Sequence, residues 1–251
     1  MRFGMPVLVD RPRLDDCLAL CESLGLDFVE INMNLPEYAQ LSKQLPAHAW
    51  GKITLHMDER FDPWHYHPDI AAAHIKTLQE TQQWASKNNV PKVTLHMNEG
   101  VYFTLPEGRV YLQQRYRDTF LRQTETMLQA IQTGEVLVCI ENTGGWTPVQ
   151  REGLEMLLSA PQCALTWDVG HDSGAGHADT VFLETHQIRI AHMHLHDTAF
   201  KQSHLPLGTG EDDLHTPIAF AQTHDVDTVI EVKTPEGLRQ SVAWLEKQGV
   251  I

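Results

Sequence analysis

The sequence contains no apolar run of about 18 residues, the length that a membrane-spanning helix requires. Its first residues, MRFGMPVLVDRPR, include a short apolar stretch but neither the extended apolar core nor the small-residue cleavage site of a signal peptide. Cysteine is also scarce: the four copies have no zinc-knuckle spacing, and Cys17 and Cys21 would share one helix face. We therefore expect a cytoplasmic protein with reduced thiols and no membrane partner.

Basic residues are few relative to acidic residues. The 251 residues include 19 Lys and Arg against 33 Asp and Glu, for a formal net charge of −14. Proteins that bind duplex nucleic acid normally gather a basic surface, which displaces counterions from the phosphates. The charge balance therefore argues against a nucleic-acid partner. Histidine, by contrast, is abundant at 15 copies, and this number calls for a site or another reason.

Short apolar, β-branched runs alternate with longer segments of helical periodicity along the whole chain. The expected strands are 2–9, 27–33, 52–57, 91–97, 135–141, 163–168, 188–195 and 227–232. The expected helices include 13–24, 69–87, 110–132, 150–158 and 235–247. No segment has the composition of a flexible linker, so we expect a single domain over residues 1–251.

This alternation predicts a parallel sheet with right-handed crossovers, which either an open doubly wound sheet or a closed barrel would satisfy. Two observations favour the barrel. Strand–helix units that fill a chain of about 250 residues match the usual size of a (β/α)8 TIM barrel. No Gly-rich phosphate fingerprint follows the first strand, as an open dinucleotide-binding sheet would require. The expected fold class is therefore α/β, with one (β/α)8 TIM barrel.

Ionisable side chains stand at the ends of the expected strands. The tetrapeptide TLHM occurs twice, at 54–57 and 94–97, and each copy places a histidine at the end of an apolar run. From the second strand to the eighth, the strand-end residues are Glu30, His56, His96, Glu141, Asp168, His194 and Glu231. A barrel brings these ends together at the face that carries the active site. Because clustered carboxylates need a compensating cation, the set predicts a divalent metal, and its mixture of imidazole and carboxylate favours Zn²⁺, Mn²⁺ or Co²⁺.

Five segments in this order resemble the motifs of the xylose-isomerase-like TIM barrels, a superfamily that includes sugar isomerases, sugar epimerases and the endonuclease IV group. The segments are VCIENTGG, LTWDVGHDSG, AHMHLHD, HLPLGTGEDD and VIEVKTPEG, and the resemblance covers nearly the whole chain. The metal ligands that it implies are Glu141, Asp168, His194 and Glu231. It also implies an isomerase or epimerase in which Glu141 and Glu231 move a proton at the carbon next to the carbonyl of a sugar, sugar acid or polyol-type ketone.

Four further residues are expected at the substrate. The resemblance implies that His171 and His204 hold substrate oxygens or complete a further metal site. Glu30, at the end of the second strand, is expected to contact the substrate. Trp64, in the segment FDPWHYHPD, is expected to belong to a lid over a small ligand. His192 is expected to be a buried packing residue below the site.

His56 and His96 keep an alternative open. In endonuclease IV the histidines at these positions bind a second zinc with the strand-five glutamate, so the resemblance also implies a zinc phosphoesterase with a two- or three-metal site. Gln202 stands where that pattern has an aspartate, and neutral Gln is a poor zinc ligand, which argues against the three-metal form. A third hypothesis, a barrel that only senses a sugar or a metal, is disfavoured because the ligand set is intact.

The partners expected from these features are small. We expect one divalent metal ion per chain, with two or three as the alternative, and a carbohydrate-like substrate. Relatives of this kind often pair, so a homodimer is an open expectation.

Overall fold

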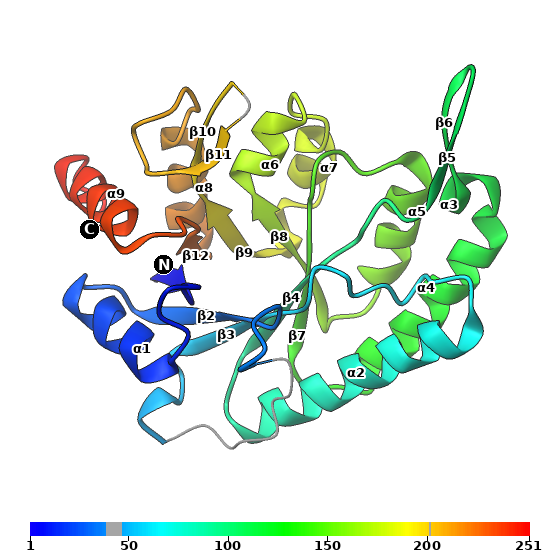
Figure 1. Cartoon of the computed structure of the whole chain (residues 1–251), viewed down its shortest axis with the longest axis horizontal. Coiled ribbons are helices and arrows are strands. Elements are labelled where there is room, and N and C mark those ends of the chain that lie inside the picture. Colours follow the sequence, from blue (N-terminus) through cyan, green and yellow to red (C-terminus); the bar gives the residue numbers. More distant parts are fainter. Residues whose placement is uncertain (39–46, 201) are drawn as a thin grey trace.

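Eight parallel strands close into a barrel in the computed structural model, in which the structure describes residues 1–38, 47–200 and 202–251 (Figure 1). The barrel strands are β1 (Phe3–Pro6), β2 (Phe28–Asn32), β3 (Ile53–His56), β4 (Lys92–His96), β7 (Leu137–Glu141), β8 (Cys163–Asp168), β9 (Ile190–Leu195) and β12 (Asp227–Ile230). They neighbour one another in that order, and β1 pairs with both β2 and β12. The expected fold class is confirmed, and the carboxyl ends of all these strands meet at one mouth of the barrel.

Helices cover the outside of the barrel, and the longer ones bury one face. Their bounds are α1 (Leu14–Ser23), α2 (Pro68–Lys87), α3 (Leu112–Arg115), α4 (Arg117–Gln132), α5 (Pro148–Leu157), α6 (Val169–Gly174), α7 (Thr180–Thr185), α8 (His215–His224) and α9 (Pro235–Lys247), with 3-10 turns η1 (Ala47–Ala49) and η2 (Gln187–Arg189). Thr147 and Thr234 cap α5 and α9 by accepting hydrogen bonds from backbone N–H groups of the first turn. Within the described ranges, no helix combines the length and the apolar character that crossing a membrane requires.

Two antiparallel hairpins lie outside the expected pattern. β5 (Tyr102–Leu105) and β6 (Gly108–Tyr111) project from the chain after β4, and β10 (Asp197–Ala199) pairs with β11 (Gln202–Leu205) after β9 (Figure 1). The expected helix 110–132 is therefore wrong at its start, because Val110 and Tyr111 lie in β6. Gly108 takes a φ of +130° at the turn, and the facing rings of Tyr102 and Tyr111 lie 5.4 Å apart, which stabilises a hairpin here.

The amino-terminal end of the barrel is closed by packing and by one ion-pair cluster. The ring of Phe28 lies against Gly4. Lys92 Nζ lies 2.8 Å from Asp227 Oδ2, and Arg2 contacts the same oxygen at 2.7 Å. These charges are paired with one another, so they offer no free group for chemistry.

Gly4 lies at a tightly packed position in the closed end of the barrel, where a larger side chain would clash. A Cβ atom on Gly4 would lie 2.5 Å from the ring of Phe28, which is 1% exposed and therefore packed on its other sides. We expect Gly4→Ala to lower the free energy of unfolding by about 1–3 kcal/mol through overpacking, as measured by urea denaturation. Gly174→Ala is the matched control, because a Cβ there contacts nothing within 4 Å. Equal losses of stability in the two variants would contradict this packing constraint.

Candidate metal centre

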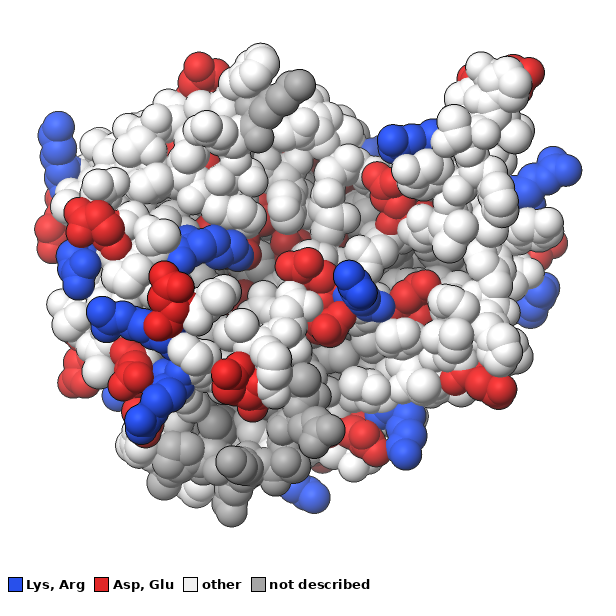
Figure 2. Space-filling view, in the orientation of Figure 1, with Lys and Arg blue, Asp and Glu red and all other residues white. Residues whose placement is uncertain are grey.

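A pocket of about 400 Å³ opens at the carboxyl ends of the barrel strands. The face shown in Figure 2 is hollowed near its centre, and acidic side chains lie in the hollow. Six of the predicted site residues line the pocket, namely His56, His96, Glu141, His171, His204 and Glu231. The parallel barrel has therefore gathered side chains that are far apart in the sequence, as the strand-end pattern predicted.

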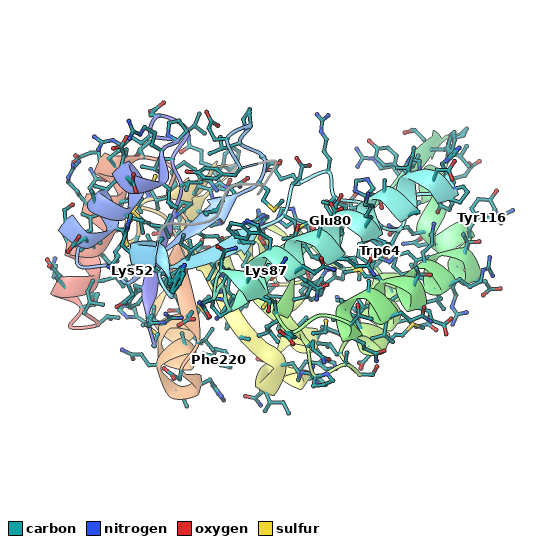
Figure 3. All side chains as sticks on the ribbon, turned by 90° about the horizontal axis from the view of Figure 1, so that it is seen from below. Lys52, Trp64, Glu80, Lys87, Tyr116 and Phe220 are labelled. Atoms are coloured by element: carbon teal, nitrogen blue, oxygen red, sulfur yellow. The ribbon has the colours of Figure 1, made fainter. Side chains whose placement is uncertain are left out.

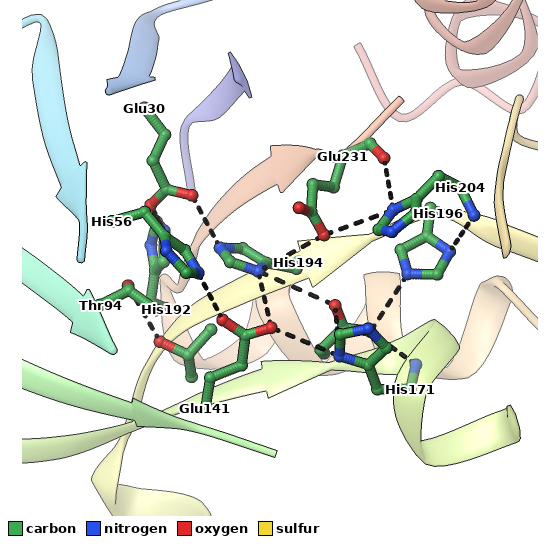
Figure 4. A network of polar contacts seen from close by, with 12 residues as sticks. Glu30, His56, Thr94, Glu141, His171, His192, His194, His196, His204 and Glu231 are labelled. Carbon is green, nitrogen blue, oxygen red and sulfur yellow. Dashed lines mark hydrogen bonds and ion pairs between the residues drawn. The ribbon is translucent and has the colours of Figure 1, made fainter. Parts of the chain in front are cut away.

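Four side chains converge on one point at the base of this pocket (Figure 4). Nδ1 of His194 lies 3.3 Å from Oε1 of Glu141 and 3.6 Å from Oε2 of Glu231. It lies 3.8 Å from Oδ2 of Asp168. Ligand atoms about 2.0–2.1 Å from a tetrahedral zinc ion are about 3.3 Å from one another. Glu141, Asp168 and His194 each place one ligand atom within 4.8 Å of the others, so these three fit around a single divalent ion, and Glu231 lies beside them.

The second polar atom of each of these side chains is engaged elsewhere, which orients the group. The four contacts are Glu141 Oε2 with His56 (3.0 Å), Asp168 Oδ1 with the backbone N–H of His171 (2.6 Å), Glu231 Oε1 with the Lys233 ammonium, and His194 Nε2 with Glu30 (2.9 Å). His194 Nε2 lies 2.9 Å from Glu30 Oε1 as an ion-pair contact, without the geometry of a hydrogen bond. The atoms that face inward, Asp168 Oδ2, Glu231 Oε2 and His194 Nδ1, are buried and form no hydrogen bond among the described residues. Buried polar atoms are almost always satisfied in native proteins. A shared cation would satisfy all three at once.

The carboxylates of the centre are ionised at neutral pH, as metal ligands must be. Burial alone would raise the pKa of each carboxyl group, but neighbouring cationic groups outweigh it. The imidazole of His194 contributes most to lowering the pKa of both Glu141 and Glu231, and that of His171 contributes most for Asp168. The centre is therefore a buried anionic site, and the imidazoles beside it supply part of its counter-charge.

His56 and His96 both face the outer oxygen of Glu141. Their Nε2 atoms lie 3.0 Å and 3.2 Å from Oε2. His56 directs Nδ1 at the carbonyl of Met57 at 2.7 Å, so the neutral ring would present the lone pair of Nε2 to a carboxylate. Two acceptors are not stable at that distance without a cation between them, either a proton or a metal ion. Burial would lower the pKa of His56, but Glu141 raises it more, which favours a proton there when no metal is bound.

His171 and His204 lie beside the centre and leave one ring nitrogen available. Nδ1 of His171 lies 3.2 Å from the carbonyl of Asn142, and Nδ1 of His204 lies 3.1 Å from that of Glu231. Burial lowers the pKa of His204 to about 4, so this ring is neutral. Burial would also lower the pKa of His171, but the carboxylates beside the ring raise it to about 9. The pair thus offers one acceptor and one cationic donor to oxygen atoms in the pocket.

A family model described as the xylose isomerase-like TIM barrel matches residues 18–248. The chain belongs to this family. The resemblance carried by the five sequence segments is thereby confirmed.

Solved structures of the same fold superpose on almost the whole chain. A D-tagatose 3-epimerase-like protein has a TM-score of 0.74 at 19% identity and covers 98% of this chain and 96% of its own. The 3-keto-D-glucoside 4-epimerase YcjR from E. coli has a TM-score of 0.74 at 14% identity, with coverage of 98% and 99%. A protein from Thermus thermophilus, solved after soaking with ZnCl2, has a TM-score of 0.68 at 18% identity, with coverage of 98% and 97%. No curated protein matches this chain significantly in sequence.

Glu30 lies inside the barrel rather than at its mouth. β2 continues to Asn32, which lines the pocket in its place. The carboxylate of Glu30 is 2% exposed and contacts His192 and His194, both at 2.9 Å. The expected substrate contact of Glu30 is therefore corrected, because the carboxylate is occupied by these two imidazoles. His192 is buried below the centre, as expected.

Trp64 lies away from the pocket, on the outer side of the barrel beside α2 and α4 (Figure 3). Its side chain is 2% exposed and stacks on the ring of Phe120. The indole N–H donates a 2.9 Å hydrogen bond to Thr124 Oγ1. The expected lid role of Trp64 is therefore corrected: the apolar ring is used for packing between the barrel and its helices.

The strand-end pattern assigns no role to Lys233 or His196. Lys233 is the only Lys or Arg among the described residues that line the pocket, and its ammonium donates to Glu231. His196 is fully buried and lies 3.3 Å from Asp168 Oδ1. Its ring fills the space above Gly170, where a Cβ atom would lie 1.9 Å from it. Both residues follow a predicted metal ligand by two positions, so the period-two alternation of extended chain was the available signal.

The position of Trp64 predicts an effect on stability rather than on ligand binding. Trp64→Phe removes the hydrogen bond to Thr124 and leaves unfilled volume beside Phe120. We expect the free energy of unfolding to fall by about 1–3 kcal/mol in chemical denaturation. Metal content, measured by elemental mass spectrometry, should stay the same. If Trp64→Phe lost metal but kept its stability, Trp64 would instead contribute to the metal site.

Proposed function

We propose that this protein is a divalent-metal-dependent isomerase or epimerase that acts on a sugar, a sugar acid or a related polyol-type ketone. The single observation that carries the proposal is the convergence of three carboxylate oxygens on the buried Nδ1 of His194. A mixed set of imidazole and carboxylate ligands suits Zn²⁺, Mn²⁺ or Co²⁺. When bound, such an ion would polarise carbonyl and hydroxyl oxygens of the substrate.

Glu141 and Glu231, which both border the pocket, would carry out the proton transfer. The C–H bond next to the ketone breaks, the proton passes to one carboxylate, and the electron pair delocalises onto the carbonyl oxygen. Return of a proton from the other carboxylate, which for Glu141 would be supplied by the protonated His56 beside it, gives the isomer or epimer. Lys233 keeps Glu231 ionised, which suits a base, while Glu141 shares its outer oxygen with His56 and His96.

The pocket fits a small polyol. Its volume of about 400 Å³ lies at the lower end of the range of small-molecule sites. His171 and His204 present imidazole nitrogens to it, and Asn32 and Thr143 add short polar side chains. Structural neighbours with epimerase names support the same substrate class, since they include proteins named for D-tagatose, D-allulose and L-ribulose.

The contact of His56 and His96 with one oxygen of Glu141 favours a second candidate, a zinc phosphoesterase of the endonuclease IV kind. If a metal ion replaced the proton between these groups, Glu141 would bridge two ions. Paired metals suit the hydrolysis of phosphoesters, because they hold both the attacking and the leaving oxygen. The absence of Arg from the described pocket lining and the net charge of −14 favour the isomerase over this candidate.

Metal stoichiometry separates the two candidates. We expect one divalent ion per chain, measured by elemental mass spectrometry on protein purified without chelator. Asp168→Ala should lose this ion because it removes an inward ligand atom, whereas His96→Ala should retain it. The exposed His224→Ala serves as the matched control. Two or three zinc ions per chain, with one lost in His96→Ala, would instead favour the phosphoesterase and direct the search to phosphoesters.

Proton exchange at the substrate carbon tests the reaction itself. In D₂O with saturating Mn²⁺, the protein should introduce deuterium next to the ketone of at least one compound in a panel of ketoses and keto-acids, as seen by NMR. Glu231→Gln should reduce the exchange rate by at least about 10²-fold, because the amide cannot accept the proton. Glu236→Gln, an acidic residue in the first turn of α9, is the control and should exchange at the wild-type rate. Equal exchange in both variants would remove Glu231 from the reaction.

A further inference from the structure

Glu30 is a carboxylate that neither touches the pocket nor coordinates the centre directly. It is 2% exposed and lies inside the barrel, between β2 and β9 (Figure 4). Its Oε1 lies 2.9 Å from Nε2 of His194. Its Oε2 lies 2.9 Å from Nε2 of His192 and accepts a 3.2 Å hydrogen bond from the hydroxyl of Thr54. A buried carboxylate with three such neighbours is fixed in position.

The contact with Glu30 decides which nitrogen of His194 is available. An ionised carboxylate is an acceptor only, so the nitrogen that faces it must carry a proton. That nitrogen is Nε2, so once a metal ion displaces the proton from Nδ1, the lone pair of the neutral ring lies on Nδ1. Nδ1 is also the atom that faces Glu141, Asp168 and Glu231.

Two competing states of His194 would abolish this arrangement. In the other neutral tautomer the proton would sit on Nδ1, where a metal ion must bind. In a ring turned by 180° about the Cβ–Cγ bond, carbon atoms would replace both nitrogens at their present contacts. The ring of His56, stacked at a centroid distance of 5.7 Å, restricts tilting but does not discriminate nitrogen from carbon. The Glu30 contact makes that distinction on the side of the ring away from the centre.

We infer that Glu30 is a positioning residue for the metal centre: it holds His194 in the ring orientation and tautomer that direct the lone pair of Nδ1 at the metal. His192 and Thr54 anchor Glu30 in turn, so that the arrangement runs from the barrel interior to the mouth. A carboxylate that contacts the second ring nitrogen of a metal-binding imidazole also makes that imidazole a better ligand. Loss of such a carboxylate typically weakens metal binding about 10- to 100-fold. The inference rests on the metal centre of the proposed function but not on the isomerase reaction.

Metal affinity of Glu30→Gln tests this role. The glutamine keeps the size of the side chain, but its NH₂ group can only donate, so it cannot accept protons from both His192 and His194. We expect the dissociation constant for Zn²⁺, measured by competition with a chromogenic chelator, to rise about 10- to 100-fold. Glu236→Gln, the same substitution at an exposed residue in the first turn of α9, is the matched control. It should change the dissociation constant less than about threefold.

A second measurement needs no variant and reports the tautomer directly. Long-range ¹H–¹⁵N NMR of the zinc-loaded wild-type protein should show His194 protonated on Nε2, with Nδ1 shifted by the metal. Zinc bound through Nε2, or a proton on Nδ1, would overturn the inference even if Glu30→Gln failed to fold. An unchanged zinc affinity in a folded Glu30→Gln protein would overturn it as well. Failure of deuterium exchange with every ketone would count against the isomerase reaction alone, because the zinc measurements decide the role of Glu30 independently.

Discussion

Buried negative charge is the constraint on which the rest of this structure depends. Four carboxylates, those of Glu30, Glu141, Asp168 and Glu231, lie within the barrel or at its mouth with exposed fractions of 8% or less. An unpaired buried carboxylate costs several kcal/mol, so none of them is stable alone. Each has one oxygen held by an imidazole, an ammonium or a backbone N–H, and three of them direct the other oxygen at the same point. A cation bound at that point would therefore offset the buried negative charge that the side chains leave uncompensated.

Local backbone structure makes the convergence rigid. The side chain of Asn142, which follows the ligand of β7, donates to the carbonyl of Asp168 at 2.9 Å and accepts from its N–H at 2.8 Å. Asp168 then caps α6, which begins at the next residue, and Gly170 in that helix leaves room for the ring of His196. The segments after β7, β8 and β9 thus hold one another in place. A ligand supported in this way keeps its geometry when substrate enters or leaves, which is the requirement for a preorganised site.

The strand ends could be predicted from the sequence because a parallel barrel brings every carboxyl end to one face, whatever the loops do. The prediction for Glu30 is wrong because it treats Glu30 as a strand end, although the expected strand 27–33 runs past it. β2 continues two residues beyond Glu30, and that distance moves its side chain from the mouth into the interior. The lid prediction for Trp64 is wrong for a different reason. An aromatic residue near a predicted site packs against a helix as readily as it covers a ligand, and the sequence does not show where α4 lies. In the structure Trp64 packs against α4. The end of the hairpin at 102–111 resembles the start of a helix because apolar spacing over so few residues fits either structure.

Glu141 is the residue at which isomerase and phosphoesterase chemistry diverge on this scaffold. Its inner oxygen belongs to the four-ligand centre, and its outer oxygen lies between two imidazoles. With a proton on His56, the outer oxygen stays in exchange with a proton donor, which is what an acid–base residue needs. If His56, His96 and Glu141 held a metal ion instead, the outer oxygen would be occupied by the metal and Glu141 would be less able to carry a proton. The two proposed functions would therefore compete for this one oxygen.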